Sequence, residues 1–150
     1  MLRKSSRILR NAVAASAVLL VMPALGAEAL SPEDTVIRYL TAVNSGNSEA
    51  ALNRLDLRGK SRRELNYIRG AFFDYVSRQK DVFDRKGGIV RINTKVTGDP
   101  SIVKDGGRIE VKAVLFYRDN TTPRGKLTYT LLRNGDVWNI VDEQGNIALF

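Results

Sequence analysis

The spacing of hydrophobic residues changes once along the chain, from a helical period to an alternating one. Between residues 31 and 83, apolar side chains recur every three or four positions, as in helices that bury one face. From Val90 onward, apolar and polar residues alternate, as in strands with one buried face. Helices are therefore expected before strands, and this segregated order favours a single α+β domain with the helices on one face of the sheet.

Start and stop signals divide the helical part into three helices. Ser31 can cap the first, and the Asn-Ser-Gly-Asn run at 44–47 ends it. A short second helix is expected around residues 50–55. The third helix is the longest and runs to about Phe83, and Gly70 inside it predicts close packing against another element.

The third helix opens with a capping-box pattern, because Ser61 is followed three residues later by Glu64. Gly, Pro, Asn and Asp residues then separate the alternating segments into four or five mostly antiparallel strands. Six alternating segments are the candidates for these strands, at residues 90–96, 101–104, 108–118, 127–132 and 137–141 and, as a last short one, 147–150.

The first residues have the pattern of an export signal. Basic residues and no acids precede an apolar run over 12–24, and small residues follow it. Gly26, Ala27 and Ala29 are the candidate cleavage positions, so we expect a cleaved signal peptide at 1–29 and one domain at 30–150. An uncleaved membrane anchor is the alternative, but the apolar run is shorter than the roughly 20 residues of a spanning helix. We expect a bacterial periplasmic or secreted protein with no stable membrane anchor after cleavage.

Composition narrows the chemistry. The chain has 150 residues without His or Cys, which removes the commonest metal ligands, any disulfide, and Ser-His-Asp or Cys-His catalysis. We therefore expect no metal and no cofactor. The formal net charge is +8, and half of it belongs to the four basic residues of the export signal, Arg3, Lys4, Arg7 and Arg10. A nucleic-acid partner is not expected, because no aromatic residues are interleaved with the basic ones as stacking platforms.

Two segments resemble a known superfamily. Residues 31–47 (Ser-Pro-Glu-Asp-Thr-Val-Ile-Arg-Tyr-Leu-Thr-Ala-Val-Asn-Ser-Gly-Asn) are similar to the first helix of nuclear transport factor 2-like proteins, which ends in a Gly-Asn or Gly-Asp pair. Residues 131–142, with Trp138 and Ile140 after the Asn-Gly turn, resemble the closing hairpin of the same superfamily. The similarity covers roughly residues 31–145 and is closest to small exported bacterial domains called lumazine-binding-like.

The resemblance implies a cone, in which a strongly curved sheet wraps against the helices and leaves a pocket at its open end. In some superfamily members the pocket is catalytic, and in others it binds a ligand or is filled by side chains. An isomerase-like site would need a carboxylate base in an apolar pocket with Tyr donors. Asp74 and Glu110 are expected on polar faces, and the His-Asp pair of dehydratases is missing. We therefore expect no enzymatic activity.

Three groups of residues are candidate sites. The aromatic residues that could line the pocket are Tyr39, Phe72, Tyr117, Tyr129 and Trp138. A basic patch at the start of the long helix contains Arg58, Lys60, Arg62 and Arg63. The apolar residues opposite the core faces of their strands are Val114, Phe116 and Leu132, which predict a homodimer through the sheet.

The favoured function is non-catalytic binding of a small apolar or amphipathic ligand, or of a protein partner, in the cell envelope. The alternative is an interaction or inhibitor module of the immunity type that uses the basic patch against an acidic target. An isomerase- or cyclase-like enzyme comes third, and a buried carboxylate near a Tyr hydroxyl would favour it.

Overall fold

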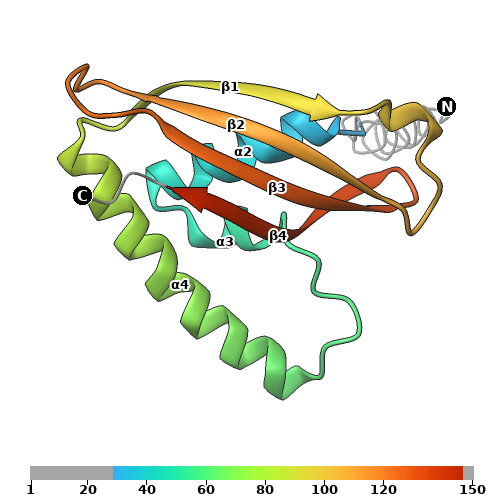
Figure 1. The fold of residues 1–150 in the computed structure, drawn as a ribbon. Helices are drawn as coiled ribbons and strands as arrows, with labels where there is room; N and C mark the ends of the chain where they lie inside the picture. The colour runs from blue at the N-terminus through green and yellow to red at the C-terminus, as the bar shows by residue number, and fades with distance from the viewer. Residues whose placement is uncertain (1–28, 147–150) are drawn as a thin grey trace, which may run out of the picture.

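The computed structural model describes residues 29–146. The expected signal peptide, except its last residue Ala29, and the last short strand expected at 147–150 lie outside this range. Within residues 29–146, three helices come first and a four-stranded sheet follows. The sheet twists and curves over the first of these helices (Figure 1). This arrangement confirms the predicted α+β class. None of the helices within residues 29–146 has the length and apolar character needed to cross a membrane.

Helix α2 (Pro32–Ser45) forms where the sequence signals placed it. The Ser31 side chain accepts a hydrogen bond from the Asp34 amide at 3.0 Å, and Gly46 ends the helix with a φ of 74°. Its apolar stripe, which includes Val36, Tyr39 and Leu40, is buried against the sheet and the other helices. A short helix, α3 (Ser48–Leu52), follows directly.

Helix α4 (Arg62–Arg85) begins with the predicted capping box between Ser61 and Glu64. It packs against α2 and α3, and its first half runs away from the sheet (Figure 1). Only Val76, Val82 and Phe83 are buried, all in its second half. The expectation of close packing at Gly70 is wrong, because a Cβ added there would have no neighbour within 4 Å.

The sheet is an antiparallel meander in the order β1-β2-β3-β4. Its strands are β1 (Ile89–Thr97), β2 (Arg108–Tyr117), β3 (Gly125–Asn134) and β4 (Val137–Asn146). The strand expected at 101–104 is wrong. A short 3-10 helix, η2 (Pro100–Ile102), occupies part of that segment, since Pro100 lacks an amide hydrogen and the Asp99 side chain accepts from the Ser101 amide at 2.9 Å.

The two faces of the sheet differ sharply in burial. The inner face, against α2, carries the alternating apolar residues predicted from the sequence, and those of β2 are Ile109, Val111, Ala113, Leu115 and Tyr117. All five are buried. The outer face carries the intervening residues, which are exposed or half-buried.

Strand β4 contains a bulge that decides which residues face inward. Leu131 pairs with Ile140 and Thr130 pairs with Asp142, so Val141 has no partner in the register. Beyond this point the alternation is shifted by one residue, which places Glu143 opposite Tyr129 on the inner face. The expected end of the strand at 141 was therefore too early.

The free edge of β4 is covered at the same place. The Ile140 amide donates to the Arg54 carbonyl at 2.8 Å, and the Asp56 amide donates to the Ile140 carbonyl at 2.9 Å. This parallel bridge fixes the bulged segment to the chain that follows α3. The position of Glu143 is thus held by two neighbouring segments, one on each side of β4.

Candidate ligand site

Residues from four elements meet at the inner face of the sheet. Tyr39 of α2 lies edge-on to Tyr129 of β3, with ring centroids 5.7 Å apart. Phe72 of α4 lies 6.4 Å from Tyr39 and stacks on Tyr75 at 5.9 Å. We name Tyr39, Tyr75, Tyr129 and Glu143 the tyrosine–carboxylate cluster.

One strong hydrogen bond orders this cluster. The Tyr75 hydroxyl donates to Oε1 of Glu143 at 2.7 Å, joining α4 to β4 across 68 positions of sequence. The Tyr129 side chain is fully buried, and its hydroxyl has no hydrogen-bond partner among the described residues. A buried hydroxyl without a partner is costly, and this oxygen is shielded from solvent, so a ligand would reach it only if neighbouring side chains moved.

The electrostatics keep the tyrosines neutral. Burial is the main cause that raises the pKa of Tyr39, Tyr75 and Tyr129 above the ordinary value of 10.0, and the negative charge of Glu143 raises each pKa further. All three hydroxyls therefore keep their protons at physiological pH. The cluster offers neutral hydroxyl groups beside one carboxylate.

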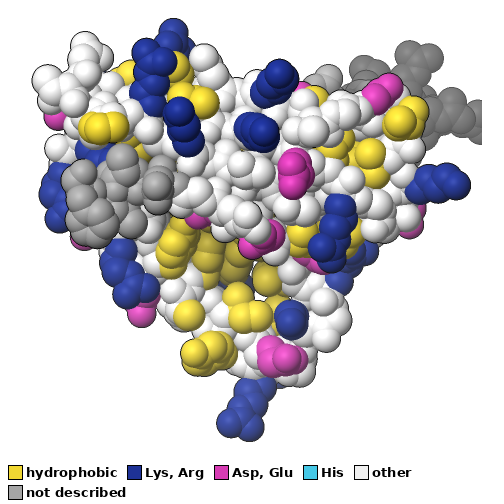
Figure 2. All heavy atoms as spheres, viewed as in Figure 1, with side chains coloured by type: hydrophobic (Ala, Val, Ile, Leu, Met, Phe, Trp, Pro, Cys, Tyr) yellow, Lys and Arg dark blue, Asp and Glu magenta, His cyan; other side chains and the backbone are white. Residues whose placement is uncertain are grey.

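An apolar surface continues from the cluster along α4. Figure 2 shows hydrophobic side chains gathered in a recess between the sheet and the projecting half of α4. Leu65, Ile68, Phe72 and Phe73, which belong to the predicted apolar stripe of α4, are half-buried. A molecule with one polar end and an apolar body would meet hydrogen-bonding groups and then hydrophobic surface.

The structure brings together three of the five predicted pocket residues. Tyr39, Phe72 and Tyr129 contact one another or share neighbours in the cluster. Tyr117 lies elsewhere, 6.1 Å from Phe83, and Trp138 lies near the start of β4 with the Arg133 guanidinium 5.9 Å from its ring.

Sequence reasoning missed Glu143. Simple alternation from Trp138 and Ile140 would turn residue 142 inward and residue 143 outward, and only the bulge at Val141 reverses this. Asp74 and Glu110, the acids considered from the sequence, are exposed. A half-buried carboxylate near Tyr hydroxyls is therefore present, from a residue that the sequence pattern did not single out.

The predicted basic patch lies at the start of α4. Arg58, Lys60, Arg62 and Arg63 are all exposed. The Arg58 guanidinium pairs with Asp56 at 2.8 Å, and its hydrogen bond holds the pKa of that carboxyl below its usual range. The other three form no ion pair within residues 29–146.

The three residues expected at a dimer interface lie on the outer face of the sheet. Val114, Phe116 and Leu132 are half-buried there. Phe116 is flanked by Arg91 and Arg124, whose guanidinium carbons lie 3.9 and 4.5 Å from the ring centroid. Within the described part of the chain, no group of three or more acidic residues is arranged to hold a metal ion.

Comparison with known proteins adds one similarity. No model of a known protein family matches the sequence, and no curated protein matches it. A solved structure from Campylobacter jejuni, described as a "Putative NTF2-like transpeptidase", superposes with a TM-score of 0.65 at 17% sequence identity. The match covers 75% of this chain and 99% of that one. The closer resemblance to lumazine-binding-like domains stays a prediction.

Proposed function

Because the chain has the nuclear transport factor 2-like (NTF2-like) fold, we propose that its inner-face site binds a small amphipathic ligand. The observation that supports this most is the Tyr129 hydroxyl, which is buried without a partner beside Glu143. A polar group of a ligand would satisfy that hydroxyl, and the half-buried residues of α4 would cover its apolar body. The site would act by binding alone.

A neutral fluorescent probe tests this proposal. N-phenyl-1-naphthylamine has an apolar body and a single amine, and its fluorescence rises in apolar surroundings. We expect saturable enhancement with the chain, weakened about fivefold in Tyr129→Phe by the loss of one hydrogen bond. Tyr117→Phe is the matched control, because it removes a second buried and unpartnered hydroxyl outside the cluster. Equal binding by both variants, or no saturable enhancement, would contradict the proposal.

The natural ligand requires a different measurement. Native mass spectrometry of the chain purified from its own cell envelope should show a retained small molecule. The same molecule should be depleted in Tyr129→Phe and retained in Tyr117→Phe. Recovery of ligand-free chain from both the unaltered protein and the Tyr117→Phe variant would count against a resident ligand.

A proton-transferring enzyme is a second candidate, favoured by the Tyr75–Glu143 hydrogen bond. A carboxylate base with tyrosine donors is the arrangement that isomerase chemistry requires. Isomerisation of a β,γ-unsaturated steroid ketone, followed by ultraviolet absorbance, tests this candidate. Turnover that is abolished in Glu143→Gln and unchanged in Asp74→Asn would support the enzyme. The absence of turnover would favour binding alone.

The interaction module remains the alternative, supported by the exposure of the basic patch. Retention on immobilised heparin, a polyanionic glycan, is a simple measure. If the patch is the site, Arg62→Gln with Arg63→Gln should reduce retention and leave binding of the naphthylamine probe unchanged.

The export of the chain is also a proposal, supported by the basic, apolar and small-residue segments of its first 29 residues. Intact mass measurement of the chain from a bacterial periplasm should show cleavage after Gly26, Ala27 or Ala29. A full-length chain retained in the membrane fraction would instead support the uncleaved anchor.

A further inference from the structure

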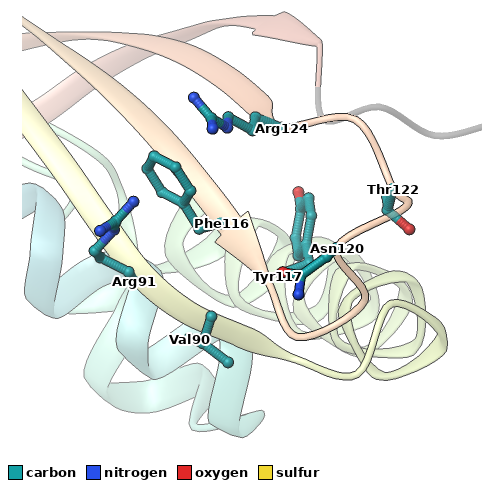
Figure 3. Close-up of a pocket in the computed structure, with 7 residues that line it drawn as sticks. All are labelled: Val90, Arg91, Phe116, Tyr117, Asn120, Thr122 and Arg124. Carbon is teal, nitrogen blue, oxygen red and sulfur yellow. The ribbon is translucent and has the colours of Figure 1, made fainter.

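A cavity lies on the outer side of the sheet, away from the tyrosine–carboxylate cluster. It has a volume of about 480 Å³ and lies where β1, β2 and the loop before β3 meet (Figure 3). The residues that line it are Val90, Arg91, Phe116, Tyr117, Asn120, Thr122 and Arg124. None of them is acidic, and two are arginines.

The two arginines are held by the aromatic ring between them. Arg91 is the register partner of Phe116 on β1, and Arg124 precedes β3 on the other side of β2. Figure 3 shows the Phe116 ring lying between the two guanidinium groups. Stacking uses the flat face of a guanidinium and leaves the N–H donors at its edge free. Neither arginine forms an ion pair with another described residue.

Tyr117 borders the same cavity, although its ring points to the inner face of the sheet. The Tyr117 side chain is 3% exposed, and its hydroxyl has no hydrogen-bond partner among the described residues. Burial raises the pKa of Tyr117 to about 12, so the hydroxyl keeps its proton at neutral pH. Gly125 leaves room for this hydroxyl, because a Cβ there would lie 2.7 Å from it.

The nearest acid in the sequence is already engaged. Both carboxylate oxygens of Asp119 accept hydrogen bonds from the turn that follows it, from the Thr121 amide and hydroxyl at 3.0 and 2.7 Å and from the Thr122 hydroxyl at 2.8 Å. The carboxylate closes the loop and forms no ion pair with either arginine. Arg91 and Arg124 have no ion-pair partner within the described residues.

The neighbouring rows of the outer face add to this charge. Lys95 is directly opposite Lys112, and Lys126 is opposite Val114. Like charges directly opposite each other are unfavourable in a sheet. The acids of this face come one row beyond the lysine pair, at Glu110 and Asp142. Figure 2 shows Lys and Arg side chains over the strands at the top of the view.

We propose that this cavity, which we name the outer-face pocket, binds a phosphate group. Arg91 and Arg124 would each direct N–H donors at its oxygens. A phosphate presents three acceptor oxygens to the two guanidinium groups, whereas a carboxylate has only two oxygens. The group would belong to a soluble phosphorylated molecule or to a phospholipid headgroup.

Calorimetric titration of the full chain with inorganic phosphate, at constant ionic strength, tests the site. We expect saturable binding that Arg91→Gln with Arg124→Gln weakens at least about tenfold, since two charge-assisted hydrogen bonds are lost. The matched control is Arg62→Gln with Arg63→Gln, which removes the same charge from the basic patch and should leave the affinity within about twofold. Circular dichroism checks that all variants remain folded.

Three results would overturn the proposal. They are the absence of saturable binding, an equal loss of affinity in both double variants, and an equal affinity for acetate, which is a carboxylate. The first result would show that the cavity does not bind phosphate. The second would show that binding depends only on the net charge of the chain, and the third that the cavity does not prefer phosphate to a carboxylate. Tyr129→Phe should not affect phosphate binding, so this test is independent of the inner-face site.

Vesicles separate the two sources of the phosphate group. The chain is sedimented with vesicles of phosphatidic acid or of phosphatidylcholine. Co-sedimentation with phosphatidic acid alone, lost when inorganic phosphate is added as a competitor, would assign a lipid headgroup. Binding of phosphate in solution without such sedimentation would assign a soluble ligand. Sedimentation that Arg91→Gln with Arg124→Gln leaves unchanged would contradict the outer-face pocket as the lipid site.

Discussion

Replacing Tyr129 or Tyr75 with Phe removes one oxygen atom from neighbouring positions in the same cluster, and the two changes should have opposite effects on stability. The Tyr129 hydroxyl is buried and unpartnered among the described residues, whereas the Tyr75 hydroxyl donates to Glu143 at 2.7 Å. The comparison therefore isolates the hydrogen-bonding state of the hydroxyl from the size of the ring.

The magnitudes follow from these two states. Leaving a buried hydroxyl unsatisfied costs about 1–3 kcal/mol, so Tyr129→Phe should raise the free energy of unfolding by about 1–2 kcal/mol. A hydrogen bond to a charged group contributes about 1.5–3 kcal/mol. Because Tyr75 is only half-buried, Tyr75→Phe should lower the free energy of unfolding by a smaller amount, about 1–2 kcal/mol.

Urea unfolding followed by tryptophan fluorescence measures both effects. The chain has a single tryptophan, Trp138, which is buried at the start of β4 and reports the opening of the sheet. With a typical urea dependence, the unfolding midpoint of Tyr129→Phe should lie above that of the unaltered chain and the midpoint of Tyr75→Phe below it. The midpoints of the two variants should differ from each other by about 1–2 M urea. If Tyr129→Phe is destabilising by more than about 1 kcal/mol, its hydroxyl has a partner and the reasoning for the ligand site fails.

Three further predictions concern the scaffold. Gly70→Ala should raise the free energy of unfolding by up to about 1 kcal/mol in urea unfolding, because the site is an open helix interior; a loss would show that close packing exists there after all. Gly145→Ala should destabilise by about 1–3 kcal/mol, since its φ is 128° and a Cβ would meet the Lys126 carbonyl; thermal unfolding checks this, and an unchanged midpoint would contradict it. In alkaline titration, Tyr39, Tyr75 and Tyr129 have raised pKa values in the folded state, so they stabilise the fold below pH 10 and that contribution is lost as the pH rises further. Their ionisation, followed by ultraviolet absorbance, should coincide with unfolding, and reversible ionisation in the folded chain would refute the assigned burial.

Local signals predicted most of the element boundaries, because caps and turns depend on residues close together in sequence. The Ser31 and Ser61 caps form as expected, and Asn134 and Gly135 turn β3 into β4. The strand expected at 101–104 failed for an equally local reason, the competition of Pro100 and the Asp99 side chain. These features need no information from distant parts of the chain.

The candidate sites were only partly predictable, because each depends on contacts between distant segments. Alternation correctly placed Tyr129 on the inner face and Phe116 on the outer face. It could not show that Tyr75 reaches Glu143 or that Arg91 and Arg124 approach the Phe116 ring from the two sides of β2. The apolar character of Phe116 predicts a dimer, which stays a prediction. Arg91 and Arg124 give this end of the outer face a basic surface.

Periodicity and backbone chemistry are enough to predict the order of helices and strands, the caps, and which strand positions are apolar. Tertiary structure decided the chemistry of the two sites. The bulge at Val141 is fixed by pairing with Leu131 and by the bridge to Arg54 and Asp56, and it alone turns Glu143 toward the tyrosines. A shift of one residue in register reverses every side chain beyond it, so the acidic group of the inner site could be assigned only from the paired strands.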